Sequence, residues 1–156
     1  MRIAHDKAEQ KVLDDIAKFG WHFVSVMEDE THPPHGFTVG LFETFNHPEV
    51  LIIGLDAKLM HSMANEIARN LKAGQSISPG DNYPGLITDF DCVLVNVDKA
   101  HYQSHVGFAR WYYEGNNFPL VQCVWPSNEG LFPWQEGAPS NFVSWQSVLG
   151  NHEQSA

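Results

Sequence analysis

Short runs of apolar residues, separated by glycine, proline and asparagine, make up most of this chain. The clearest pair lies in residues 36–55, where two runs rich in β-branched residues flank a short polar connection. That pattern predicts two strands joined by a loop. Because residues 50–53 are continuously apolar, both faces of the second strand should be covered. Gly40 and Gly54 lie in or beside these strands and predict a bulge or a close approach of two backbones.

Residues 6–19 follow the period of an amphipathic helix. Asp6 suits the N-cap, and Glu9 lies three residues later, which is the spacing of a capping box. Gly20 can adopt the left-handed conformation that ends a helix. The sequence therefore predicts an N-terminal helix with defined ends.

Two further helices are predicted later in the chain. Asp56 suits the N-cap of a helix whose apolar positions recur every four residues until Gly74. Asp98 could cap a helix over about residues 99–113, and residues 115–117 are of the Gly-Asn type that breaks a helix.

Three more stretches have the alternating or continuously apolar pattern of strands, and turn residues separate them. Residues 28–35 and 75–85 are rich in loop-forming residues, so we expect loops there. The aromatic tail over residues 126–134 should wrap over the core as a lid or packing strand. The additional strands are predicted at residues 21–27, 91–97 and 119–125.

The length and composition fit one packed domain. A chain of 156 residues can build one ordinary core, and its 43% hydrophobic content is typical of a globular protein. We predict a single α+β domain over residues 1–156, with flexible ends at residues 1–5 and about 150–156. Its sheet should be mainly antiparallel, curved or barrel-like, with about five to seven strands and two or three helices.

The charge of the chain limits the classes of partner that it is expected to bind. Nineteen acidic residues against nine Lys and Arg give a formal net charge of −10. This balance disfavours nucleic acid, whose binding depends on cations, and it disfavours an anionic membrane surface. It would suit a basic protein partner. The N-terminus lacks the apolar core of a signal peptide, and no apolar run approaches the roughly 18 residues of a membrane span, so we predict a cytoplasmic protein.

Cysteine and histidine spacings give no strong metal signal. Cys92 and Cys123 lie in apolar, strand-like segments, so we expect two buried free thiols. His32-Pro-Pro-His35 could project two imidazoles from one side of an extended segment, and His101/His105 could do so on a helix. No third ligand is evident near the first pair, and the second lacks the glutamate of the zinc-protease motif. We therefore predict no metal site and interpret residues 32–35 as a solvated loop.

Titratable and aromatic side chains beside the predicted strands suggest one candidate site. His47 and Glu49 could form a catalytic acid/base pair, because a carboxylate can orient a neighbouring histidine. Late aromatic residues and a glutamine could line a pocket that stacks a planar ligand. Each of these residues also has a structural interpretation: a turn histidine, an edge glutamine or a core tryptophan. The predicted ligand-binding residues are His22, His35, Thr38, Gln122, Trp125 and Trp134.

Several motifs occur in an order that is typical of one family. They are Gly20-Trp21-His22, Phe37-Thr38-Val39-Gly40-Leu41, His47-Pro48-Glu49, Phe118-Pro119, Gln122, Trp125-Pro126, Gly130 and Phe132-Pro133-Trp134. Over roughly residues 20–134 this combination resembles the bacterial DUF4262 family, a domain of unknown function. The resemblance implies a family and leaves the activity and the cofactor unknown.

The order of elements is also similar to that of the flavin-reductase-like split barrels, on pattern alone. That similarity would imply a dimeric flavoprotein. A flavin phosphate would need cations or a helix N-terminus, and the candidate cations are Lys58, Arg69 and Arg110.

Three functions are compatible with the sequence. The first is binding of a small molecule, with or without an enzymatic activity, in a pocket between the His47 loop and the region of residues 122–134. The second is a flavin-binding split-barrel oxidoreductase, which would be a homodimer. The third is a non-catalytic interaction protein, such as a toxin-neutralising or accessory factor, with a basic protein partner.

Overall fold

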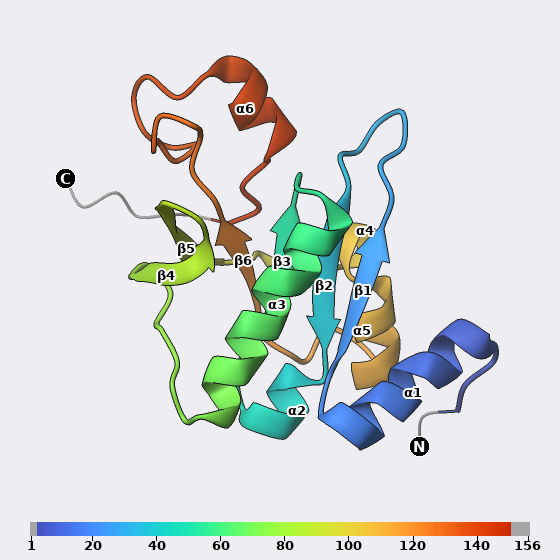
Figure 1. Cartoon of the computed structure of the whole chain (residues 1–156). Helices are drawn as coiled ribbons and strands as arrows, with labels where there is room; N and C mark the ends of the chain where they lie inside the picture. The colour runs from blue at the N-terminus through green and yellow to red at the C-terminus, as the bar shows by residue number, and fades with distance from the viewer. Residues whose placement is uncertain (1–2, 151–156) are drawn as a thin grey trace.

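An open six-stranded sheet forms the centre of the molecule, and helices cover both of its faces (Figure 1). The computed structural model describes residues 3–150. The strands are β1 His22–Val26, β2 His35–Val39, β3 Glu49–Ile53, β4 Asn82–Ile87, β5 Phe90–Asn96 and β6 Leu120–Val124. The helices are α1 Lys7–Phe19, α2 Leu41–Phe45, α3 Ala57–Lys72, α4 Tyr102–His105, α5 Gly107–Tyr113 and α6 Ser140–Trp145, and a 3-10 turn, η1, spans Lys99–His101.

The strand order is β1-β2-β3-β6-β5-β4. All neighbouring strands are antiparallel except β3 and β6, which run parallel at the centre. The pairing aligns Phe37, Leu51, Gln122 and Val95 in one row across the sheet. Gln122 is the polar member of this row, so its side chain needs hydrogen-bond partners inside the core.

Two helical layers enclose the sheet. On one face α3 contributes Met60 and Met63 to the core, and on the other face α1 and α5 contribute Val12 and Tyr112. Every residue of β2, β3 and β6 is buried as a result. This confirms that both faces of the apolar run at residues 50–53 are covered. Within residues 3–150, no helix combines the length and the apolar character that a membrane span needs.

The predicted ends of the two long helices are confirmed. The Asp6 side chain accepts a hydrogen bond from the backbone N–H of Glu9 at 2.8 Å. Gly20 ends α1 with a φ of 90°, in the left-handed conformation that glycine adopts without strain. Asp56 accepts hydrogen bonds from two backbone N–H groups in the first turn of α3. Cys92 and Cys123 are free and buried, as predicted.

The polar connection after β2 differs from the predicted loop. β2 ends at Val39, Gly40 has a φ of 109°, and the five-residue helix α2 follows. A Cβ at Gly40 would lie 2.9 Å from the Gly20 carbonyl oxygen, which confirms the close backbone approach predicted there. A helix this short forms because the Glu49 carboxylate binds its first backbone N–H groups.

The helix predicted over residues 99–113 is wrong as one continuous element. This span contains η1, α4 and α5. Val106 separates the two α-helices with φ −129° and ψ 51°, and its side chain is fully buried in the core. The free energy gained by burying the Val106 side chain therefore outweighs the hydrogen bonds that a continuous helix would have made. Within the described chain, Asp98 stands at the start of η1 without a capping hydrogen bond from its side chain.

The predicted α+β class with a mainly antiparallel sheet is confirmed, and the sheet is open rather than closed into a barrel. Residues 3–150 contain six α-helices, more than predicted, because short helices form inside connections. β4 begins at Asn82, inside the loop predicted over residues 75–85. Pro84 is tolerated there because β4 is an edge strand. Of the ends predicted to be flexible, residues 1–2 and 151–156 lie outside the described residues.

The segment after β6 folds back onto β5 and β6 (Figure 1). Phe132 and Trp134 stack with their ring centroids 5.1 Å apart and pack on the apolar side chains of these strands. The Gln146 side chain accepts from the backbone N–H of Trp125 at 3.0 Å and donates to its carbonyl at 2.7 Å. A side-chain amide thus takes the place of a neighbouring strand at the end of β6.

Candidate functional site

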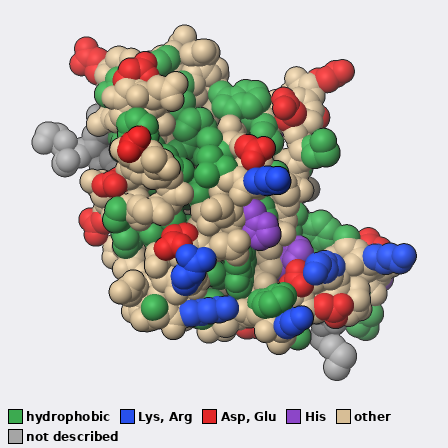
Figure 2. Space-filling model, viewed as in Figure 1, with side chains coloured by type: hydrophobic (Ala, Val, Ile, Leu, Met, Phe, Trp, Pro, Cys, Tyr) green, Lys and Arg blue, Asp and Glu red, His purple; other side chains and the backbone are tan. Residues whose placement is uncertain are grey.

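Basic side chains gather on one face of this acidic molecule. Six of the nine Lys and Arg residues lie on α1 and α3. Figure 2 shows these side chains in blue, with histidine in purple between them, over the two helices. Acidic side chains lie among them, so this face carries charges of both signs although the formal net charge of the chain is −10. The six residues are Lys7, Lys11, Lys18, Lys58, Arg69 and Lys72.

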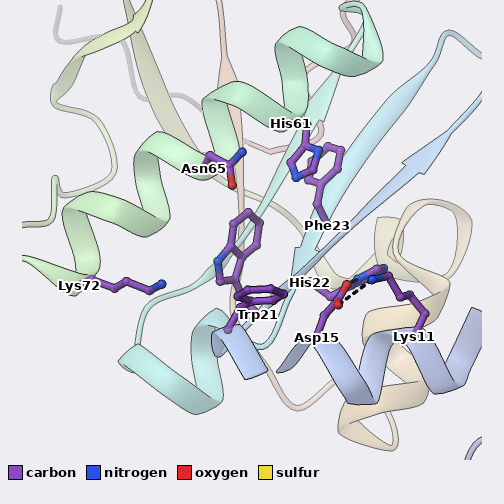
Figure 3. Close-up of a pocket in the computed structure, with 9 residues that line it drawn as sticks. Lys11, Asp15, Trp21, His22, Phe23, His61, Asn65 and Lys72 are labelled. Atoms are coloured by element: carbon purple, nitrogen blue, oxygen red, sulfur yellow. Dashed lines mark hydrogen bonds and ion pairs between the residues drawn. The ribbon is translucent and has the colours of Figure 1, made fainter. Parts of the chain in front are cut away.

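A cleft of about 520 Å³ opens on this face, between α1, β1 and α3 (Figure 3). This volume lies within the range of small-molecule sites in proteins, which is roughly 300–1,000 Å³. We call it the aromatic cleft. Its lining residues are Lys11, Asp15, Phe19, Trp21, His22, Phe23, His61, Asn65 and Lys72.

The alternation of β1 explains how one strand serves two walls of the cleft. Successive side chains of a strand point to opposite faces, so Trp21 and Phe23 join the core on the α3 side. His22 points the other way, toward α1. Because β1 is an edge strand, no further strand covers it on this side.

Asp15 on α1 fixes the ring of His22. The His22 Nδ1 donates to the Asp15 carboxylate at 2.6 Å, and the Lys11 ammonium donates to the other carboxylate oxygen at 2.9 Å. Burial opposes ionisation of Asp15, but the hydrogen bonds from Lys11 and His22 outweigh it and lower the pKa of Asp15. With Nδ1 occupied, Nε2 is the ring nitrogen of His22 that stays available to a ligand.

Planar rings form the apolar part of the cleft. The His61 ring on α3 lies parallel to Phe23, at 5° and a centroid distance of 4.9 Å. Trp21 meets His61 edge-on at 6.3 Å. Phe19, at the end of α1, remains 49% exposed, although a large aromatic side chain favours burial. The exposed aromatic surface of the cleft thus comes from Phe19 and the His61 ring, because Trp21 is only 8% exposed and His61 stacks on Phe23.

His47 lies in a second, smaller cavity of about 220 Å³. Its ring Nδ1 donates to the Pro48 carbonyl at 2.7 Å. Burial lowers the pKa of His47, and this hydrogen bond opposes the shift. The remaining lining residues of this cavity are Asn46, Pro48, Ser76, Ile77, Ser78, Pro79, Leu94 and Val121.

Glu49 is fully buried, and five donors surround its carboxylate. Three are backbone N–H groups at the start of α2, the fourth is the Thr38 hydroxyl at 2.7 Å, and the fifth is the Tyr113 hydroxyl. Burial raises the pKa of Glu49, whereas these donors favour its anionic form. Glu49 therefore binds α2 and Tyr113, whereas His47 binds the Pro48 carbonyl, so the two side chains have different partners.

The three late residues predicted to line a pocket are used in contacts within the fold. Gln122 is fully buried, donates to the Ser147 carbonyl at 2.8 Å and accepts from the Leu149 N–H at 2.9 Å. The Trp125 ring N–H donates to the Ile53 carbonyl at 2.8 Å. Trp134 packs on β5 and β6, and none of the three residues lines the aromatic cleft.

His35 belongs to a cluster of histidines on the face of the sheet that α5 covers. Its Nε2 donates to the His105 carbonyl at 2.9 Å, and the two rings lie 5.4 Å apart. His101 lies 6.3 Å from the His105 ring. Across residues 3–150, no group of three or more His, Cys, Asp and Glu side chains is arranged to hold a metal ion. The prediction of no metal stays a prediction.

This cluster predicts that the protein loses stability in mild acid. Burial lowers the pKa of both His35 and His105 from 6.5, and the nearby histidines lower it further. The unfolded chain then binds more protons than the folded one, so stability should fall as the pH drops below about 6.5. Urea denaturation at pH 7.5 and 5.5 would measure this difference. His105→Gln should reduce it and the exposed-site control His5→Gln should not; equal pH dependence in all three proteins would contradict the assignment.

Of the predicted site residues, the structure places only His22 in the aromatic cleft. The remaining lining residues of the cleft were not predicted from the sequence. They come from α1 and α3 as well as from β1 and its start, so segments that are distant in sequence have to meet. One local signal was present: the aromatic–histidine–aromatic triplet of residues 21–23 directly after an amphipathic helix.

The open sheet and the cleft at its β1 edge define a small α+β protein with a ligand-sized site beside an edge strand. The chain belongs to the family described as Domain of unknown function (DUF4262), whose model matches residues 15–139. This confirms the resemblance that the motifs indicated. The matched region contains every lining residue of the aromatic cleft except Lys11. No curated protein and no solved structure matches the chain.

Proposed function

We propose that this protein binds a small molecule in the aromatic cleft. The observation that carries the proposal is the exposed aromatic surface in a cleft of about 520 Å³, next to a histidine whose ring is fixed by Asp15. Ligand sites are typically concave and largely apolar, with a few placed polar groups that set orientation. The aromatic cleft has this composition.

The cleft supports the proposal better than the region between the His47 loop and residues 122–134. There, Gln122 uses both ends of its amide on the backbone of the C-terminal segment. Trp125 donates its ring N–H to β3. These contacts stabilise the fold and leave few polar groups for a ligand.

A variant that fills the cleft tests the proposal. Asn65 is an exposed lining residue on α3, so Asn65→Trp should occupy the cleft with little loss of stability. In a ligand-observed NMR fragment screen, fragments that bind the wild type should lose binding to Asn65→Trp. The matched control is Gln103→Trp, at an exposed position of α4, which should keep the same fragments.

Two results would contradict binding in the cleft. One is a set of fragments that all bind Asn65→Trp as well as the wild type. The other is a wild-type protein that binds no fragment and carries no small molecule in native mass spectrometry after purification without added ligand.

The remaining functional predictions stay predictions. They are catalysis by His47 and Glu49, ligand contacts of His35 and Thr38, flavin binding, a basic protein partner, a homodimer and a cytoplasmic location. Of the three cations considered for a flavin phosphate, Lys58 and Arg69 lie on α3 and Arg110 lies on α5. These two helices cover opposite faces of the sheet, so the three cations do not form one phosphate site.

A further inference from the structure

The walls of the aromatic cleft favour a flat ring as ligand. His61 on α3 and Phe23 on β1 already stack in parallel, so this wall of the cleft is itself built from planar rings. Phe19 adds exposed aromatic surface from the end of α1, and the edge of the largely buried Trp21 ring lines the cleft beside it. Planar rings gain from offset stacking and edge contacts beyond the area they bury. A saturated ring of similar size would fill the volume without these contacts.

The cations of the cleft are not equally available. The Lys11 ammonium already pairs with Asp15, whose second oxygen accepts from His22. Lys72, at the end of α3, is exposed, and its ammonium has no ion pair or hydrogen bond with any residue in the part of the chain that the structure describes. Figure 3 shows Lys72 extending toward the Trp21 ring from the side opposite Lys11 and Asp15. One uncommitted positive charge therefore faces the aromatic surface.

From these two features we infer that the aromatic cleft binds a planar aromatic anion, such as an aromatic carboxylate. The ring lies against the aromatic side chains, and the negative group is paired with the Lys72 ammonium. The volume of about 520 Å³ suits a ligand of one or two fused rings rather than a large cofactor. This inference rests on the proposed function and adds the chemical class of the ligand.

A matched set of probes separates ring binding from charge recognition. The probes are 2-naphthoate, its neutral amide and 2-naphthylmethylamine, which share one ring system and differ in charge. By isothermal titration calorimetry, the wild type should bind the carboxylate roughly tenfold more tightly than the amide, and the amine most weakly. Added salt should weaken the binding of the carboxylate and leave that of the amide unchanged.

Lys72→Gln should remove the preference for the carboxylate while the affinity for the amide stays the same. The control is Lys99→Gln, an exposed lysine on η1, which should keep the preference. A lysine in the last turn of a helix also stabilises the helix electrostatically, so thermal unfolding of both variants is measured alongside. A small loss of stability cannot by itself change the ratio of two affinities.

The outcomes distinguish this inference from the function on which it rests. Equal affinities for the carboxylate and the amide, or a preference that survives in Lys72→Gln, would overturn the anionic class. If Asn65→Trp abolishes amide binding in that case, the cleft remains a binding site for a neutral ring. Failure of all three probes to bind at millimolar concentration would overturn the inference, and the fragment screen would decide the proposed function separately.

Discussion

Glu49→Gln should lower the free energy of unfolding by about 3–5 kcal/mol. The carboxylate accepts from five donors inside the core. A glutamine amide carries an NH₂ group in place of one oxygen, and in either orientation this group faces at least two of those donors. Stability of the whole domain is typically about 5–15 kcal/mol, so this loss is a large share of it. Urea denaturation, followed by circular dichroism, measures the change.

Two variants place this result in context. Tyr113→Phe removes only one of the five donors and should cost about 1–2 kcal/mol. Glu28→Gln makes the same substitution at an exposed loop position and should be neutral. If Glu49→Gln were as stable as Glu28→Gln, the carboxylate would not be holding α2, and a catalytic role for Glu49 would gain support.

Gln122→Ala should cost about 2–4 kcal/mol and release the segment that follows α6. The substitution leaves the Ser147 carbonyl and the Leu149 N–H without their partner and opens a cavity at the centre of the sheet. Hydrogen exchange should therefore accelerate at the Leu149 amide more than at amides of β3. Denaturation and amide exchange report the two effects independently.

The cavity and the lost hydrogen bonds can be separated. Gln122→Leu keeps most of the volume and loses both hydrogen bonds, so it should release the segment nearly as much as Gln122→Ala while costing less stability. Gln103→Ala, at an exposed site on α4, controls for the change of residue type. Unchanged exchange at Leu149 in both Gln122 variants would show that other contacts hold this segment.

The elements that could be predicted from the sequence are those whose signals are local. α1 and α3 have capping residues and a regular apolar period, and β1, β2 and β3 have alternating or continuous apolar patterns. The class of the fold followed from them. α2 could not be predicted, because its first turn depends on Glu49, which lies after the helix in sequence. The break at Val106 could not be predicted either, because it depends on burial against other elements.

The candidate site was predicted less well than the fold, for a related reason. His22 was recognised, but Asp15 and His61 join it in the lining of the cleft only because α1 and α3 flank one edge of the sheet. The late tryptophans suggested a pocket, yet Trp134 packs on β5 and β6 and the Trp125 ring donates to β3. The composition could suggest that aromatic side chains bind a ligand. The position of the aromatic cleft could not be predicted, because it depends on which strand lies at the edge of the sheet.

The position of β6 between β3 and β5 has a consequence for synthesis of the protein in the cell. The first three strands leave the ribosome long before residues 120–124, so β3, which is apolar from Val50 to Ile53, presents an unpaired edge throughout that interval. Such an edge can pair with another chain. Nascent chains that stall before β6 should therefore be the form of this protein most prone to aggregation and most dependent on chaperones.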